Sequence, residues 1–189
     1  MQSRALVVSL FLVLPGSLVA QDTPFRAGQW AAQFAGGFSS IGVIKFKSPT
    51  RALVLDVSVS GDHREEFAGD TVDTINSHAF IRVQLGRRVY RPVAEKIVAQ
   101  HTLGFLVAFD HDASTNPFLG STHSTQWGGG PFAEVGAVYL LTPHLGIGAT
   151  GTASITYGRT SGKSFTGTKT SGWASTADAH IAFSATIFF

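Results

Sequence analysis

Apolar residues recur at every second position along most of this chain, and this periodicity restricts the fold more than any other feature. Between Leu145 and Tyr157 the odd positions are apolar or Gly, whereas the even positions are Gly, Ser or Thr. The same period of two runs through residues 177–189, where the sequence stops on an aromatic residue. A period of two predicts β-strands with one apolar and one polar face.

Six further segments are predicted as strands, at residues 27–35, 38–47, 51–60, 77–90, 97–109 and 132–141. Short connections that contain Pro alternate with long polar segments near residues 61–76, 110–131 and 158–172, which we expect to be loops. Short turns at one end and long loops at the other are typical of transmembrane β-barrels. One question stays open: residues 27–47 form either two strands around a tight turn at Gly36 and Gly37 or one bent strand, which would reduce the strand number.

The N-terminal region has the features of a secretory signal peptide. An arginine precedes an apolar run over residues 5–14, Pro and Gly end that run, and cleavage is expected before Gln21. The run is too short to cross a bilayer, which takes about 20 apolar residues. We therefore divide the chain into a signal peptide at residues 1–20 and one domain at residues 21–189.

Composition favours a membrane barrel over a soluble one. Charged residues make up 14% of the chain, fewer than a water-exposed surface usually carries. Aromatic residues stand near the ends of the apolar faces, as expected for the two membrane interfaces: Trp30, Tyr139, Tyr157, Trp173 and Phe189. The sequence predicts an all-β fold, an eight-stranded antiparallel up-and-down transmembrane β-barrel with a plugged or narrow lumen. A soluble exported β-barrel that binds an apolar ligand is an alternative, because alternation alone does not say which face points inward.

Two short motifs carry a family resemblance. The sequence closes with ATIFF, and GGFSS near the N-terminus is followed by KFKSPT. With the signal peptide and the predicted strands, these motifs resemble the small bacterial outer-membrane β-barrel proteins of the OmpA and OmpX type. The resemblance implies a location in the outer membrane, contact with outer-membrane lipid and lipopolysaccharide, and recognition of the last strand and Phe189 by the barrel-assembly machinery. It also implies a structural or surface-interaction role without catalysis and without a cofactor, and it leaves the oligomeric state open.

The polar faces of the predicted strands carry charged side chains that would point into the lumen: Asp56, Arg82, Arg88, Glu134, Asp178 and His180. Isolated charges are costly to bury, so we expect opposite charges to pair. A structural salt-bridge plug is the favoured interpretation. A gated ion path or a binding site is the alternative.

Charge is distributed unevenly along the chain. The segment at residues 61–74 is acidic, and four of its residues are weak candidates for divalent metal ligands: Asp62, Glu65, Glu66 and Asp70. They lack the regular spacing of a calcium loop, so a solvated acidic loop is favoured. Basic residues instead gather near the expected short turns: Lys45, Lys47, Arg51, Arg87, Arg88, Arg91 and Lys96.

A lipid hydrolase is a further alternative. His123, Ser124 and Glu134 are the residue types of a Ser-His-acid set, which the outer-membrane lipid A deacylases carry at the rim of a barrel. Those enzymes have His-x-Ser on a strand, whereas this chain has His123-Ser124-Thr125, with Thr in place of the Ser. Such sets are recognised by geometry rather than by sequence proximity, so the sequence favours a non-enzymatic protein. A formal net charge of +2 likewise gives no support for nucleic-acid binding.

Overall fold

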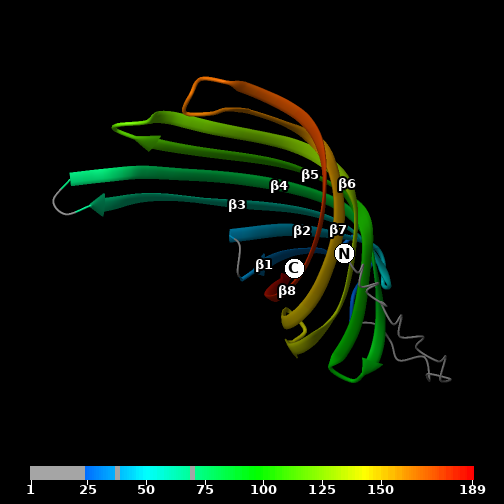
Figure 1. Ribbon diagram of the computed structural model, residues 1–189. Helices are drawn as coiled ribbons and strands as arrows, with labels where there is room; N and C mark the ends of the chain where they lie inside the picture. The colour runs from blue at the N-terminus through cyan, green and yellow to red at the C-terminus, as the bar shows by residue number, and fades with distance from the viewer. Residues whose placement is uncertain (1–23, 37–38, 69–70) are drawn as a thin grey trace, which may run out of the picture.

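The chain folds into eight β-strands that close into a barrel (Figure 1). The computed structural model describes residues 24–36, 39–68 and 71–189, so the predicted signal peptide lies outside the described part. The strands are β1 (Trp30–Ala35), β2 (Ser39–Ser48), β3 (Arg51–Ala68), β4 (Thr71–Ala94), β5 (Ile97–Asn116), β6 (Gly120–Thr142), β7 (Leu145–Lys163) and β8 (Lys169–Phe188). No helix among the described residues is long and apolar enough to cross a membrane.

Each strand pairs antiparallel with the next one in the sequence, and β1 pairs with β8 to close the ring. Two backbone hydrogen bonds complete this closure. The Trp30 N–H donates to the Phe189 carbonyl at 3.2 Å, and the Phe189 N–H donates to the Trp30 carbonyl at 3.0 Å. Residues 27–47 therefore contribute two strands, and the predicted eight-stranded up-and-down barrel is confirmed.

The three long polar segments are mostly strand, and the prediction that they are loops was wrong. β3 pairs with β4 up to Ala68, β5 pairs with β6 up to Asn116, and β7 pairs with β8 up to Lys163. The apolar alternation stops in these extensions because both of their faces meet water, while the backbone ladder continues. We call the end of the barrel with these extensions the loop end and the opposite end the short-turn end.

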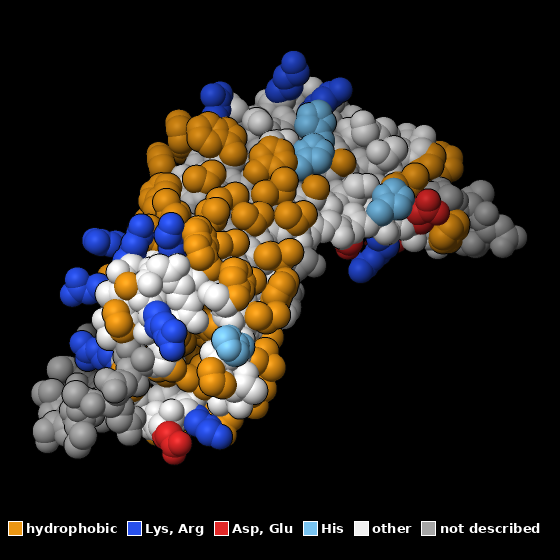
Figure 2. All heavy atoms as spheres, turned by 180° about the vertical axis from the view of Figure 1, so that it is seen from behind, with side chains coloured by type: hydrophobic (Ala, Val, Ile, Leu, Met, Phe, Trp, Pro, Cys, Tyr) orange, Lys and Arg blue, Asp and Glu red, His pale blue; other side chains and the backbone are white. Residues whose placement is uncertain are grey.

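The apolar face of the strands points outward. Large side chains on this face are widely exposed, among them Leu103 at 64%, Val135 at 67% and Ile181 at 76%. Figure 2 shows hydrophobic side chains over the middle of the outer wall, with Lys and Arg gathered toward its ends. We call this band the apolar belt. A soluble barrel with an apolar interior is not favoured by this arrangement.

The lumen is aromatic at the short-turn end, which the sequence analysis did not predict. Phe25, which precedes β1, packs against Phe46, Tyr90 and Phe188 with ring centroids 4.7, 4.9 and 5.0 Å away. Aliphatic side chains buried in the same cluster surround these rings: Ile44, Val98, Val138 and Leu140. We call the four rings the aromatic floor. Polar residues were expected here, but inward side chains of a barrel this narrow meet one another and fill the interior.

β1 and β2 are short, so the wall of the barrel is lower on their side (Figure 1). The register pairs of β1 with β8 end at Ala35 and Ser184. Those of β2 with β3 end at Ser39 and Val59. The seam between the first and last strands is therefore much shorter than the seam between β7 and β8, which runs from Leu145 to Lys163.

Candidate functional site in the lumen

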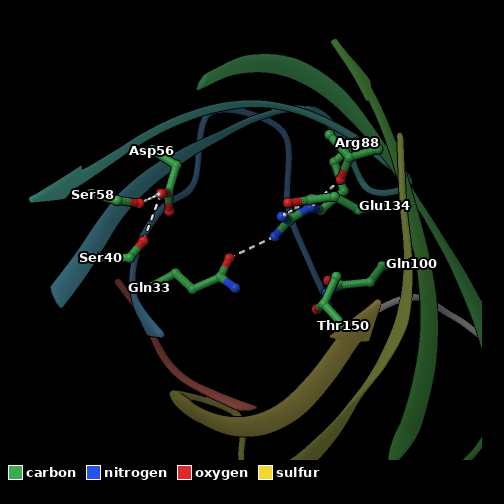
Figure 3. Close-up of polar contacts among 9 residues, drawn as sticks. Gln33, Ser40, Asp56, Ser58, Arg88, Gln100, Glu134 and Thr150 are labelled. Atoms are coloured by element: carbon green, nitrogen blue, oxygen red, sulfur yellow. Dashed lines mark hydrogen bonds and ion pairs between the residues drawn. The ribbon is translucent and has the colours of Figure 1, made fainter. Parts of the chain in front are cut away.

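Arg88 is the centre of a hydrogen-bond network above the aromatic floor (Figure 3). It lies on β4, with 3% of its side chain exposed. Its guanidinium donates to Thr102 Oγ1 of β5 at 2.8 Å, to Gln33 Oε1 of β1 at 2.6 Å and to Glu134 Oε2 of β6 at 2.9 Å. The register places Arg88, Thr102 and Glu134 in one row across three strands, which explains why they meet. Charge-assisted bonds of this kind are the strong ones, and here they link strands across the lumen.

A second cluster lies on the wall formed by β2 and β3. The Asp56 carboxylate accepts hydrogen bonds from Ser40 Oγ at 2.6 Å and from Ser58 Oγ at 3.5 Å. Gly42 is the register partner of Asp56 on β2. A Cβ atom on Gly42 would lie 2.8 Å from Asp56 Oδ2, so the glycine leaves the space that the carboxylate occupies.

Two more polar pairs lie in the lumen. Gln100 Nε2 donates to Thr150 Oγ1 at 3.1 Å and connects β5 with β7 (Figure 3). On β8, Asp178 Oδ2 lies 3.4 Å from His180 Nδ1. Both pairs lie on the polar face of their strands, as the period-two pattern predicts.

An aromatic ring of the lumen lies directly on the barrel wall. Phe132 of β6 shares a register row with Gly104 of β5 and Gly86 of β4. A Cβ atom would lie 2.6 Å from the Phe132 ring if placed on Gly104 and 3.1 Å from it on Gly86. The two glycines therefore allow the ring to lie against the backbone of the neighbouring strands.

Most of these polar groups line a cavity of about 270 Å³ on the loop-end side of the floor, whereas Thr102, Gln100 and Phe132 lie outside its lining. The structure places all six predicted lumen residues on its lining: Asp56, Arg82, Arg88, Glu134, Asp178 and His180. Sequence reasoning therefore identified residues that come together, although they come from several different strands. Their role as a plug, an ion path or a binding site remains a prediction.

The charges around the cavity are close to balanced. Three carboxylates face two guanidiniums and two imidazoles: Asp56, Glu134 and Asp178 against Arg82, Arg88, His78 and His180. Hydroxyl and amide groups lie between them and supply further donors and acceptors. Such a lining suits a small polar molecule of low net charge better than a strongly charged ligand.

A cluster at the mouth of the barrel was missed by the sequence analysis. His78 Nδ1 lies 2.9 Å from Asp112 Oδ1 and 4.0 Å from Asp110 Oδ1. The hydrogen bond with Asp112 is the main reason why the pKa of His78 lies above its usual value. Partial burial, together with the neighbouring Asp112, raises the pKa of Asp110. The spacing of Asp110 and Asp112 could have shown that two carboxylates lie on one face of β5. That His78 lies beside them could not be predicted, because it depends on the register of β4 against β5.

Donor atoms of these three residues all lie within 4.8 Å of one another, which is the donor set of a possible metal site. The metal candidates from the sequence lie elsewhere. Asp62 and Glu66 share one face of β3 and Glu65 lies on the other, because side chains alternate along a strand. Asp70 lies outside the described residues.

The three residues of the hydrolase alternative do not come together. His123 and Ser124 are successive residues of β6, so their side chains point to opposite faces of the sheet. Glu134 lies roughly 35 Å farther along the same strand, at about 3.3 Å per residue. No Ser-His-acid geometry results from this set.

The five predicted interface aromatics are all exposed: Trp30, Tyr139, Tyr157, Trp173 and Phe189. Tyr157 and Trp173 stack at the loop-end side of the belt with ring centroids 5.2 Å apart. Trp30 and Phe189 meet at the short-turn end through their backbone groups, and Lys45 Nζ lies 4.5 Å from the centroid of the Trp30 ring. A membrane-interface role for these rings remains a prediction.

No family model and no curated protein sequence matches this chain. Among solved structures, a major outer membrane protein from Thermus thermophilus is similar, with a TM-score of 0.57 and 12% identity over 85% of this chain and 98% of that one. CarO from Acinetobacter baumannii matches with a TM-score of 0.44 and 8% identity over 89% of this chain and 99% of that one. CarO2 from the same organism matches with a TM-score of 0.42 and 7% identity over 85% and 97% of the two chains. At 12% identity the likeness to the Thermus protein concerns the fold, and the chain has the fold of an outer-membrane β-barrel.

Proposed function

We propose that this chain is a non-enzymatic outer-membrane β-barrel protein with a structural or surface-interaction role and a lumen closed at the short-turn end. The observation that carries the proposal is the orientation of the two faces of the sheet. The apolar belt points outward, while polar and charged side chains point into the lumen. In water such a belt would be a large exposed apolar surface, whereas in lipid it is the expected exterior.

The closed hydrogen-bond ladder supports the same proposal. Lipid offers no partner to a backbone N–H or C=O group, so a sheet that crosses a membrane needs to close on itself. The pairing of β1 with β8 supplies this closure at the level of Ala31–Ala35. The long hairpins beyond the belt would then stand outside the membrane and meet partners at the cell surface.

The lumen supports a closed barrel rather than a channel. The aromatic floor fills the short-turn end, and Arg88 is bonded to three other strands just above it. None of the four floor rings lines the cavity above them. We infer a blind cavity that small polar molecules enter from the loop end only.

Two features of the outer surface indicate the proposed partners: the apolar belt and the end of the last strand. Outer-membrane lipid and lipopolysaccharide would surround the exposed apolar side chains. The barrel-assembly machinery is the proposed partner of β8, because the Phe189 ring is 67% exposed beside the closing seam.

Fractionation of cells that express the full chain tests the proposal first. We expect the protein in the outer-membrane fraction, with a band that migrates faster in an unboiled gel sample than in a boiled one. We also expect no steady ion conductance after insertion of the folded barrel into planar bilayers. A protein recovered without detergent would contradict the membrane location, and a stable open-channel current would contradict the closed lumen alone.

A further inference from the structure

Four side chains with basic groups surround one groove on the outer wall near the short-turn end. Lys47, Arg51, Arg87 and His101 come from β2, β3, β4 and β5, which are successive strands of the barrel. The groove has a volume of about 780 Å³. These four side chains lie on the face of the sheet opposite the lumen cavity. Arg88 borders both the groove and the cavity, and its guanidinium is hydrogen-bonded inside the lumen.

The strand register explains why these groups converge. Val89 of β4 pairs with Arg51 on one side and with His101 on the other. Arg87 lies two residues from Val89 on the same face, diagonal to both of these partners. Diagonal neighbours of this kind are about 7–8 Å apart at their backbones, within the reach of long side chains.

The groove also has an apolar side toward the middle of the belt. Arg87 pairs with Leu53 on β3 and with Leu103 on β5. Leu53 is 38% exposed and Leu103 is 64% exposed. Farther along β4 the outward residues are apolar, with Leu85 next to Arg87. Arg87 therefore lies at the border between the apolar belt and the basic short-turn end.

Within the described part of the chain, the cationic groups of Lys47, Arg51 and Arg87 meet no counter-charge. Among the described residues, no carboxylate lies within ion-pair distance of any of the four side chains. The lining of the groove contains no Asp or Glu. A charged side chain on the lipid face is destabilising unless it reaches the interface or meets an anion. An arginine at this border reaches the level of the lipid headgroups, where an anionic group outside the protein is within its reach.

We propose that this groove binds the phosphate of an anionic phospholipid in the leaflet around the short-turn end. The inference rests on the proposed membrane location. The forked guanidiniums of Arg51 and Arg87 match the oxygens of a phosphate. Leu53 and Leu103 lie where the acyl chains of the same lipid would run, which distinguishes a lipid from free phosphate.

Native mass spectrometry of the detergent-purified full chain tests this site. The barrel is mixed with equal amounts of dioleoyl phosphatidylglycerol and dioleoyl phosphatidylcholine, which differ in headgroup charge but share their acyl chains. We expect the wild-type barrel to retain phosphatidylglycerol preferentially. Arg87→Gln should lower this preference about fivefold, the effect of one basic group near an anionic headgroup. Arg87→Lys keeps the charge and should lose less.

Arg64→Gln is the matched control, because it removes the same charge from the loop-end extension of β3, away from the groove. Equal retention of the two lipids by the wild type would overturn the lipid site and leave the membrane barrel standing. An equal effect of Arg64→Gln would overturn it too, because net charge rather than the groove would then attract the lipid. A chain that gives no heat-modifiable band would overturn both proposals.

Discussion

The Arg88 guanidinium donates to the Glu134 carboxylate at 2.9 Å and so joins β4 to β6, two strands that are not neighbours in the barrel. The two side chains are 3% and 14% exposed. Their ion pair is therefore screened from solvent on most sides. It replaces the hydration that both charges lose on folding.

Replacing Arg88 should destabilise the barrel more than replacing both partners together. Arg88→Met leaves the Glu134 carboxylate buried without its cation, and we expect a loss of about 3–5 kcal/mol in the free energy of unfolding. The double variant Arg88→Met with Glu134→Leu should recover part of this loss, because no unpaired charge remains. Urea titration of barrels refolded into vesicles, followed by Trp fluorescence, measures both values. A double variant as unstable as the sum of the two single variants would show that the pair does not interact.

Phe25→Ala should destabilise the barrel by about 3–5 kcal/mol, the range for loss of a buried aromatic ring. Phe25 is 3% exposed and contacts three other rings of the aromatic floor. Phe118→Ala is the control, because Phe118 is 85% exposed at the tip between β5 and β6. The same urea titration should show no change for that variant. Equal effects of the two variants would contradict a packing role for Phe25.

Gly104→Ala should destabilise the barrel by about 1–3 kcal/mol through overpacking. A Cβ atom there would collide with the Leu85 carbonyl and with the Phe132 ring. At Gly172 nothing lies within 4 Å of an added Cβ, so Gly172→Ala is the matched control. Thermal unfolding in detergent compares the two variants. A Gly104→Ala barrel that unfolds at the wild-type temperature would contradict the overpacking, because both the Phe132 ring and the Leu85 carbonyl would then have to shift at no cost.

The titration of His78 should respond to Asp112. The raised pKa of His78 means that the folded state holds the proton more tightly than the unfolded chain. The stabilisation is therefore full below the unfolded value near 6.5 and is lost as the pH rises through the folded value. Asp112→Asn removes the hydrogen bond that is the main cause, so the His78 midpoint should move to lower pH in an NMR titration of the imidazole. Glu65→Gln, on the other face of β3, should leave that midpoint in place.

The raised pKa of Asp110 acts in the same direction. The folded state holds this proton above the ordinary value of 3.8, so stability falls as the pH rises from there through the folded value. Both groups therefore make the mouth of the barrel more stable toward acid. The Asp112→Asn variant should weaken this dependence.

Phe189→Ala should affect assembly in cells more than stability in vitro. The ring is 67% exposed, so its loss removes little packing, while the backbone bonds with Trp30 remain possible. We expect less heat-modifiable protein in the outer-membrane fraction but an unchanged urea midpoint for barrels refolded into vesicles. Phe189→Tyr keeps the aromatic ring and should assemble normally. A lower urea midpoint with normal assembly in cells would contradict the proposed recognition by the assembly machinery.

The period of two was sufficient to predict the strands, their order and their two faces, and the low content of charged residues favoured the apolar face as the outward one. The strand number depended on whether residues 27–47 form two strands or one, which the structure decided. The sequence pattern was not sufficient to show that the strands continue into the long extensions at the loop end. In segments such as residues 110–131 both faces are polar, and the periodicity that reveals a strand disappears although the backbone pairing continues.

In the lumen too, the sequence pattern revealed some of the residues that come together and not others. The six predicted charges were found because charged residues interrupt the strand patterns at inward positions. The aromatic floor was missed, because Phe46 and Tyr90 are inward residues of strands that were read as polar inside. The contribution of Phe25 was hidden as well, since it lies before β1 and outside any periodic segment. The cluster of His78 with two aspartates needs the register of β4 and β5, which no single strand encodes.

The closing seam has a consequence for the order in which the barrel is made. β1 obtains its second neighbour only from β8, so this pairing waits until the ribosome has completed nearly the whole strand series. Until that moment any folded part is an open sheet with a bare edge, ready to pair with another chain. Contacts between such distant segments also form slowly. A chain of this topology therefore depends on being kept unfolded during its synthesis and its delivery to the membrane. A chain truncated before β8 would form a sheet that cannot close into a barrel.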